Sequence, residues 1–265
     1  KSAVGHFYWG GTDYIGESSG WPNKGWTRGI LEITDFFKPS SYYVQSFYSD
    51  VPMVKIAVME SEVEKQVWND VSWEWQSLKA HWNFKQKDPL QVVTFSNAEE
   101  VELILNGKSL GRQKMSKFPT KKMLWNVNYK EGVLEAVGRN NGKVVSRDRI
   151  ETAGQPTSIR LLADRKKINA DGQDLSFITF EIVDKNGILC PVNEPKITFS
   201  VKGKGELIGV INGDMASDEL LQGESRSPYM GRGLLIIRST REAGEITVKA
   251  KATQLKETSI RLESR

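Results

Sequence analysis

Clustered carboxylates are the first residues in this sequence whose type and spacing could support chemistry. Glu99, Glu100 and Glu102 lie within four positions, and the last two would share one face of an extended strand. Two carboxylates on one face could divide the roles of general acid and general base. Lys108 and Arg112 nearby favour a plainer interpretation, an exposed strand edge whose acidic and basic side chains offset one another. We therefore assign no catalytic residue to this cluster.

Aromatic side chains gather in two segments that could stack on a sugar ring. Trp82 and Phe84 alternate in one segment, and Trp73 and Trp75 would point to one face if the other segment is extended. For Trp82 and Phe84 the favoured interpretation is burial in a sandwich core or at its interface. Trp73 and Trp75 could form a sugar platform or a patch that docks on another domain.

Residues that ligate metals or act as nucleophiles are sparse. With 2 His and 1 Cys, a zinc site would need carboxylates for most of its ligands, and no such cluster is present. His6 and His81 have no Ser or Cys motif beside them. Asn212-Gly213-Asp214 offers oxygen ligands for calcium, but a turn with Asx hydrogen bonds is favoured. We expect no metal site and no cofactor.

Charge and composition exclude several partners. The 37 basic and 33 acidic residues give a net charge of +4, which indicates a mildly basic surface. The densest basic run lacks the interleaved aromatic residues of a nucleic-acid groove and comprises Lys114, Lys117, Lys121 and Lys122. No apolar run is long enough to span a bilayer. Cys190 is alone, so the chain forms no internal disulfide.

The elements that position these residues fall into three segments, of which the first is residues 1–49. Residues 4–9 predict an aromatic strand, which is followed by a long Gly-rich loop. Residues 38–48 predict a helix with Pro39 near its first turn. The apolar face of that helix needs a partner surface, which we expect to be missing from this chain. A last strand, a βα loop and a closing helix are the end of an α/β (TIM) barrel, so we expect the chain to be cut from something longer.

The remaining residues predict two β-sandwiches, one over 50–153 and one over 154–265. The first contains predicted strands at 53–58, 90–95, 101–105, 125–129 and 133–138, with hairpin turns at Asn106-Gly107 and Asn141-Gly142. The second contains predicted strands at 158–161, 175–183, 196–201, 234–238 and 245–250, with turns at Asp171-Gly172 and Asn186-Gly187. The fold class is therefore mainly β: two immunoglobulin-like sandwiches preceded by a short barrel remnant.

Several motifs in a fixed order resemble a known family. The run GHFYWGGTDYIGE at 5–17 looks like the last barrel strand and loop of family 2 glycoside hydrolases of the β-galactosidase type, and residues 38–46 look like their final barrel helix. Residues 81–84, 96–103 and 106–111 resemble the sandwich that follows the barrel. Residues 170–172, 177–179 and 209–214 resemble the terminal immunoglobulin-like domain. The resemblance covers nearly the whole chain.

The resemblance implies a retaining exo-glycosidase that acts on terminal β-linked sugars, with galactose the favoured sugar. That chemistry needs two carboxylates about 5–5.5 Å apart, one a nucleophile and the other an acid/base. In the family both are Glu residues on earlier barrel strands, which would lie upstream of Lys1. We therefore expect this chain to be the non-catalytic C-terminal portion, which packs against a missing N-terminal catalytic barrel.

The resemblance also implies substrate-binding residues. The family places a Trp at the end of the last barrel strand, where an indole face packs on the sugar, and Trp9 occupies that position. Asp13 and Glu17 lie on the same loop and could reach sugar hydroxyls, although loop carboxylates are more often solvated or form turns. The expected partner is a carbohydrate, a terminal β-galactoside or a related glycan.

Two alternatives remain, a carbohydrate-binding protein without hydrolase activity and an Ig-like adhesion module. Residues 1–49 favour the hydrolase, because neither alternative needs a barrel strand and helix. The family's bacterial members of this kind are often exported, so we expect a periplasmic or secreted location.

Overall fold

Two compact units make up the chain in the computed structural model, which describes residues 9–18, 20–68, 71–85 and 89–265. The first unit comprises residues up to Asp13 together with Arg28–Thr152, and the second comprises Tyr14–Thr27 together with Ala153–Arg265. Each contains two facing sheets, so the mainly β fold with two sandwiches is confirmed. The barrel strand predicted at residues 4–9 lies outside the described residues except for Trp9.

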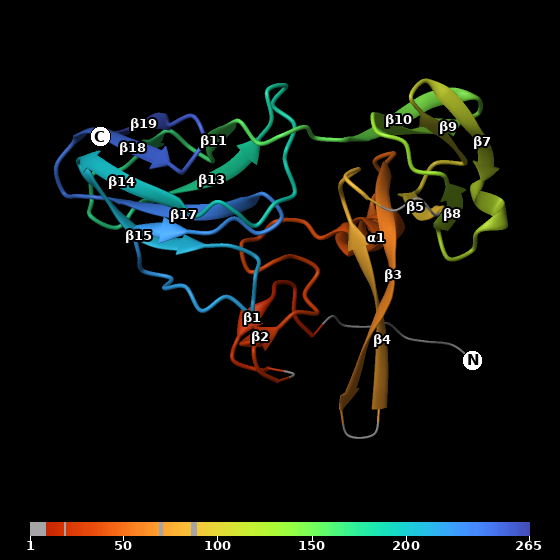
Figure 1. Cartoon of the computed structure of the whole chain (residues 1–265), viewed down its shortest axis with the longest axis horizontal. Helices are drawn as coiled ribbons and strands as arrows, with labels where there is room; N and C mark the ends of the chain where they lie inside the picture. The colour runs from red at the N-terminus through yellow and green to blue at the C-terminus, as the bar shows by residue number, and fades with distance from the viewer. Residues whose placement is uncertain (1–8, 19, 69–70, 86–88) are drawn as a thin grey trace. The chain divides into compact units, whose positions relative to one another are not determined.

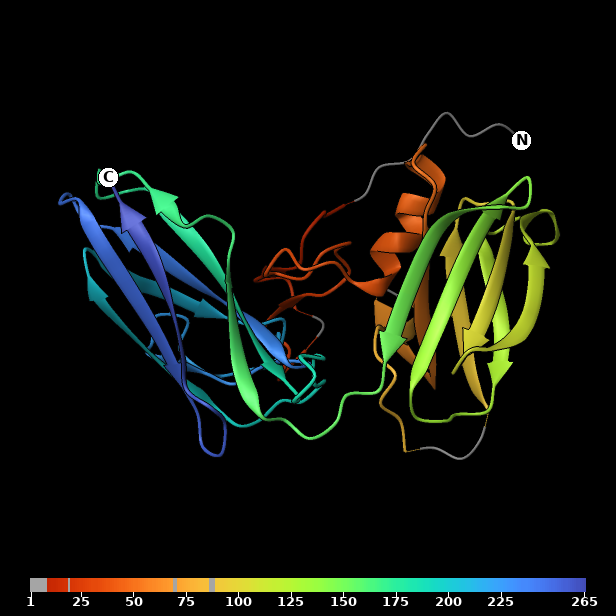
Figure 2. The same cartoon turned by 90° about the horizontal axis from the view of Figure 1, so that it is seen from above.

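The first unit is a sandwich of two four-stranded antiparallel sheets (Figure 2). One sheet has the order β10-β9-β6-β7, and the other has the order β4-β3-β5-β8. The strands of the first sheet are β6 (Glu100–Leu105), β7 (Lys108–Lys114), β9 (Val133–Asn140) and β10 (Lys143–Glu151). Those of the second are β3 (Val54–Trp68), β4 (Val71–Lys79), β5 (Leu90–Ser96) and β8 (Lys122–Val127), with a 3-10 turn η1 (Met115–Lys117) between β7 and β8.

The core of the first unit is built around Trp82. Its side chain is fully buried and contacts the rings of Phe84 and Tyr129, with centroids 6.0 and 5.1 Å away. The indole Nε1 donates to the carbonyl of Lys130 at 2.9 Å, so the one polar atom of the ring is satisfied. The prediction that Trp82 and Phe84 fill the core is confirmed.

Helix α1 (Pro39–Tyr48) begins with Pro39 in its first turn, as the sequence predicted. The expectation that its apolar face lacks a partner in this chain is wrong for Tyr43, whereas Phe47 and Tyr48 on the same helix stay exposed. Tyr43 packs on Phe95 of β5, with ring centroids 5.6 Å apart, and Tyr42 joins the same small cluster. Strand β5 therefore buries both of its faces, one against the sandwich core and one against α1 (Figure 2).

Strands β3 and β4 form a ribbon that is longer than their sheet. Strand β5 pairs with β3 only over residues 54–59, whereas β4 pairs with β3 out to Val71 opposite Trp68. Trp73 and Trp75 lie on β4, so the backbone is extended there, as their proposed roles require. Their role as a sugar platform or as a docking patch stays a prediction.

The second unit pairs a four-stranded sheet with a five-stranded one (Figure 1). The order β11-β13-β17-β15 uses β11 (Ser158–Ala163), β13 (Leu175–Val183), β15 (Gly205–Ile211) and β17 (Arg232–Ser239). The order β12-β19-β18-β14-β16 uses β12 (Lys167–Ile168), β14 (Ile197–Gly203), β16 (Ser225–Arg226), β18 (Gly244–Lys251) and β19 (Thr258–Ser264). A separate ribbon pairs β1 (Tyr14–Ile15) with β2 (Gly25–Trp26).

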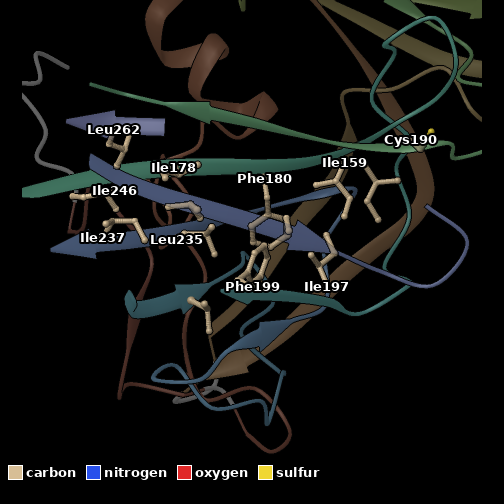
Figure 3. Close-up of a cluster of buried hydrophobic side chains, with 14 of the residues drawn as sticks. Ile159, Ile178, Phe180, Cys190, Ile197, Phe199, Leu235, Ile237, Ile246 and Leu262 are labelled. Atoms are coloured by element: carbon tan, nitrogen blue, oxygen red, sulfur yellow. The ribbon is translucent and has the colours of Figure 1, made fainter. Parts of the chain in front are cut away.

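The core of the second unit lies between its two sheets (Figure 3). Phe180 of β13 and Phe199 of β14 meet at its centre, with ring centroids 5.1 Å apart. Alternate residues of β13, β17 and β18 are buried, which is the period of two expected where one face of a strand meets the core. Cys190 is buried in the same cluster, and burial raises the pKa of its thiol to about 11. At neutral pH it is therefore a packed thiol rather than a reactive thiolate.

The two Asn-Gly turns predicted for the first unit are confirmed. Asn106-Gly107 joins β6 to β7 and Asn141-Gly142 joins β9 to β10, and all four residues have positive φ. Two-residue hairpin turns of this kind need positive φ at both positions, which Asn and Gly tolerate best.

Replacing Trp82 with Ala should lower the free energy of unfolding of the first unit by about 3–5 kcal/mol, because the change removes a fully buried indole and leaves a cavity. Urea unfolding followed by circular dichroism measures the loss. Leu124→Ala, at a half-exposed position on β8, is the control and should cost about 0.5 kcal/mol or less. Equal losses in the two variants would contradict a core role for Trp82.

Candidate functional site

Trp9 is the first described residue, and 80% of its side chain is exposed. Among the described residues few large apolar side chains are so exposed, and most of the others fill one of the two cores. An indole that is open to solvent can pack on the apolar face of a pyranose ring without displacing protein atoms. The exposure of Trp9 is thus compatible with the role that the sequence predicts for it.

Asp13 lies in the interior of the loop rather than on its surface. Its Oδ1 accepts from the Lys38 ammonium at 2.6 Å and from the Gly29 amide at 2.9 Å, and its side chain is almost fully buried. Burial raises the pKa of Asp13, although the bond and charge of Lys38 and the Gly29 amide oppose that shift. The backbone adds a further tie, because the Asp13 amide donates to the Leu31 carbonyl at 3.1 Å. Asp13 therefore stabilises the loop, and a contact with substrate hydroxyls stays a prediction.

Glu17 lies in the second unit, whereas Trp9 and Asp13 lie in the first. The Glu17 carboxylate is exposed and accepts a hydrogen bond from the Tyr14 hydroxyl. Tyr14 in turn stacks on Trp26, with ring centroids 5.5 Å apart and an interplanar angle of 21°. The three predicted binding residues thus belong to two separately folded parts of the chain, and a role of Glu17 in binding also stays a prediction.

Trp21, which the sequence reasoning missed, has a larger exposed fraction than Trp9, at 81%. It lies in the connection between β1 and β2, and the Lys24 ammonium is 5.7 Å from its ring centroid. A Trp within a loop rich in Gly, Ser and Pro was the available signal, because such loops have no core in which to bury an indole.

The carboxylate cluster at the start of β6 differs from the expectation of an exposed edge. Strand β6 is an inner strand between β9 and β7, and Glu102 is only 8% exposed. Its carboxylate accepts from Ser109 at 2.8 Å and from Arg139 at 3.2 Å, and Arg112 lies 3.3 Å away. The Ser109 hydrogen bond and the two guanidinium charges hold the pKa of Glu102 below its usual range. A carboxylate stabilised in its ionised form is a poor general acid, so the cluster stabilises the sheet.

Asn212 uses both ends of its amide within the protein. Its Oδ1 accepts from Arg226 at 2.8 Å and from the Asp214 amide at 3.1 Å, and its Nδ2 donates to the Ser227 carbonyl at 2.8 Å. Asp214 Oδ1 accepts from the Ala216 amide at 2.9 Å. The favoured prediction of a turn with Asx hydrogen bonds is confirmed.

The described ranges contain neither a metal-binding cluster nor a membrane-spanning helix. In that part of the chain no group of three or more His, Cys, Asp or Glu side chains is arranged to hold a metal ion. No helix there has the length and apolar character that crossing a bilayer requires.

Two family models match the chain. Residues 159–261, in the second unit, match the model of glycoside hydrolase family 2 C-terminal domain 5. Residues 87–146, in the first unit, match a domain of unknown function (DUF4982).

Relatives and solved structures match almost the whole chain. A β-galactosidase of Bacteroides ovatus is 33% identical over 261 residues, which are 97% of this chain and 28% of that protein. A Formosa agariphila protein with the provisional name β-glucuronidase is 31% identical over 255 residues, covering 92% of this chain and 22% of its own length. The crystal structure of a glycosyl hydrolase family 2 member from Bacteroides cellulosilyticus has a TM-score of 0.89 and 35% identity, over 97% of this chain and 35% of that one.

Replacing Asp13 with Ala should destabilise the first unit by roughly 2 kcal/mol, because the half-buried Lys38 ammonium and the Gly29 amide both lose their acceptor. Adding Lys38→Ala should cost less than the two single losses combined, since the two substitutions remove the same Asp13–Lys38 contact. Urea unfolding of the four proteins gives the coupling energy. The exposed pair Arg147–Glu135 is the control, and its cycle should give less than about 1 kcal/mol. Equal coupling in the two cycles would contradict a buried structural role for Asp13.

Proposed function

This chain is a C-terminal region of glycoside hydrolase family 2, and we propose that it serves as the non-catalytic C-terminal portion of a longer, retaining β-glycosidase. The observation that carries the proposal is the ordered similarity over 97% of the chain to part of a β-galactosidase. Because the chain spans only 28% of that relative, the activity of the longer protein is itself part of the proposal.

The chemistry of a retaining glycosidase supports a non-catalytic role for this chain. A retaining glycosidase needs a nucleophilic carboxylate and an acid/base carboxylate about 5–5.5 Å apart on either side of the scissile bond. Two buried carboxylates of the first unit were candidates for chemistry. Asp13 accepts a hydrogen bond from Lys38, and Glu102 accepts hydrogen bonds from Ser109 and Arg139. Since these contacts occupy both groups in stabilising the fold, we place the catalytic pair in the part of the longer protein that its relatives have and this chain does not span.

The role proposed for this chain in substrate binding rests on Trp9. A sugar needs a flat apolar surface under the C–H face of its ring and hydrogen-bonding groups around its rim. Trp9 supplies the flat apolar surface, because its indole is 80% exposed. It lies at the start of a loop that the Asp13–Lys38 ion pair stabilises. Active sites of α/β barrels lie at the C-terminal ends of the strands, which is where the predicted barrel strand would place Trp9.

A terminal β-linked galactose is the sugar we favour. The Bacteroides ovatus relative, whose name is that of a β-galactosidase, has the highest identity among the curated relatives compared above. A β-glucuronide is the second candidate, because the Formosa agariphila relative bears the provisional name of a β-glucuronidase. The two sugars differ in the configuration at C4 and at C6, where glucuronate carries a carboxylate in place of the hydroxymethyl group of galactose. An enzyme selective for one should therefore discriminate strongly against the other, because a site built for a carboxylate leaves a buried cation unpaired when that group is absent.

The longer protein encoded by the reading frame that contains this chain should hydrolyse p-nitrophenyl β-galactoside. The 265-residue chain alone should not, because we propose that the catalytic carboxylate pair lies outside these 265 residues. Release of p-nitrophenolate measures both, and p-nitrophenyl β-glucuronide tests the second sugar. Proton NMR of the first sugar product should show the β anomer, as retention requires. Turnover by the 265-residue chain alone, or an α-anomeric first product, would overturn the proposal.

Replacing Trp9 with Ala in that longer product should lower kcat/KM about 30-fold, which corresponds to losing roughly 2 kcal/mol of stacking and apolar contact in the transition state. Trp9→Phe keeps a flat ring and should recover most of the loss. Tyr48→Ala removes an exposed aromatic ring of the same unit and is the control that should leave kcat/KM unchanged. A Trp9→Ala enzyme with unaltered kcat/KM would contradict the stacking role.

A further inference from the structure

The ribbon β1–β2 is attached to the sandwich of the second unit through Lys24. The Lys24 amide donates to the Met215 carbonyl at 2.9 Å, and the Lys24 ammonium donates to the Ser217 carbonyl at 2.6 Å. The Lys24 carbonyl accepts from the Gly16 amide at 2.9 Å, which closes the ribbon on itself. One residue thus connects the loop at 14–27 both to its own opposite strand and to a distant part of the chain.

Gly25 makes this close approach possible. A Cβ placed there would lie 2.2 Å from the Met215 Cε and 2.2 Å from the Tyr14 carbonyl oxygen, which no side chain can tolerate. Gly25 is buried where the ribbon meets the sandwich, so the approach is a packed contact. A larger residue could displace the flexible end of the Met215 side chain, but it would still clash with the Tyr14 backbone and separate β2 from β1.

The connection between β15 and β16, which receives Lys24, is itself held by a buried arginine. Arg226 is only 2% exposed, and it donates to Asn212 Oδ1 at 2.8 Å and to the Glu219 carbonyl at 3.0 Å. The Glu219 carboxylate lies 3.5 Å from Arg226 and 2.7 Å from Lys196, which balances the buried charge. Met215 and Ser217 lie between these two fixed points. The hydrogen bonds and ion pairs of Arg226 therefore hold this connection in one conformation, and the ribbon packs against it.

What this ribbon presents to solvent is the indole of Trp21. Its exposed fraction of 81% is the highest among the large apolar side chains whose exposure the structure describes. The Lys24 ammonium that reaches Ser217 also lies 5.7 Å from the Trp21 ring centroid, within cation–π distance of the ring. An indole has only two side-chain torsions to order on binding, so its contact with a flat apolar ligand face costs little conformational entropy.

We propose that the second unit carries a glycan-binding surface of its own, in which Trp21 stacks on one ring of a β-linked oligosaccharide and Lys24, Gly25 and Arg226 are positioning residues. The choice of a glycan as ligand rests on the proposed function, whereas the surface itself rests on the contacts of this unit. A sugar ring fits an isolated indole because one apolar C–H face packs on the ring while the hydroxyls at its edge stay in water. A single stacking contact should bind weakly, with a Kd on the order of 1 mM.

The test is a titration of the 265-residue chain with β1,4-linked galactotetraose, followed by the indole N–H signals in ¹H–¹⁵N NMR spectra. The Trp21 signal is identified as the one that disappears in Trp21→Phe, and it should shift in a saturable manner. Gly25→Ala should weaken binding at least about fivefold. Gly223→Ala, where an added Cβ meets only ordinary contacts from 3.6 Å, is the matched control and should leave Kd unchanged.

Lys24 provides a second test if Gly25→Ala fails to fold. Lys24→Met removes the ammonium donor to Ser217 and should weaken binding, whereas Lys24→Arg keeps a donor and should restore most of it. An unshifted Trp21 signal at 20 mM saccharide, or equal Kd values for the wild-type and Lys24→Met chains, would overturn the inference. Neither result bears on hydrolysis by the longer product, and a longer product without glycosidase activity would leave this binding measurement intact.

Discussion

In each unit, apolar side chains on the facing surfaces of two sheets are removed from water, and every other feature of the chain rests on that burial. Trp82 and its ring partners lie between the sheets of the first unit, and Phe180 and Phe199 lie between those of the second. Burying one large apolar side chain contributes about 1.5–3 kcal/mol, so each cluster outweighs any single polar contact described above. Within the first unit the same effect acts twice, because β5 also buries its outer face under α1. The irregular segments then pack against the rigid surfaces of these sandwiches.

Polar contacts, by contrast, determine where those irregular segments lie. Asp13 and Lys38 form a nearly buried ion pair within the first unit, and Lys24 donates twice to the connection after β15 in the second. These bonds add little net stability by themselves, but a buried group that loses its partner is costly. They therefore select one loop conformation among many that would leave the sandwich cores unchanged. A long loop between Trp9 and α1 is shared in this way between two units, with each part tied to its own sandwich.

The ionisable groups of the described residues agree with the non-catalytic role that we propose for this region. Acid/base chemistry needs a carboxylate that can gain and lose a proton near the working pH. Glu102 is held in its ionised form by Ser109 and by two arginines, and Asp13 is committed to Lys38 and Gly29. Among the large apolar side chains of the described residues, the indoles of Trp9 and Trp21 are the most exposed. An indole can stack on a sugar but cannot break a glycosidic bond, so the role we propose for this chain is recognition of a glycan.

Local pattern alone determined the two sandwiches, the Asn-Gly turns and α1, because alternation, helical spacing and positive φ are properties of neighbouring residues. Strands β7 and β10 were not predicted, since both are largely polar and partly exposed and therefore alternate weakly. Only the tertiary structure decided that β6 is an inner strand, that Tyr43 covers Phe95, and that Asp13 faces Lys38. The partners of Asp13, Glu102 and Lys24 lie 25, 37 and 193 positions away, so their contacts exist only once the sheets have brought distant segments together. Whether a carboxylate is solvated or buried depends on those partners, which no local pattern records.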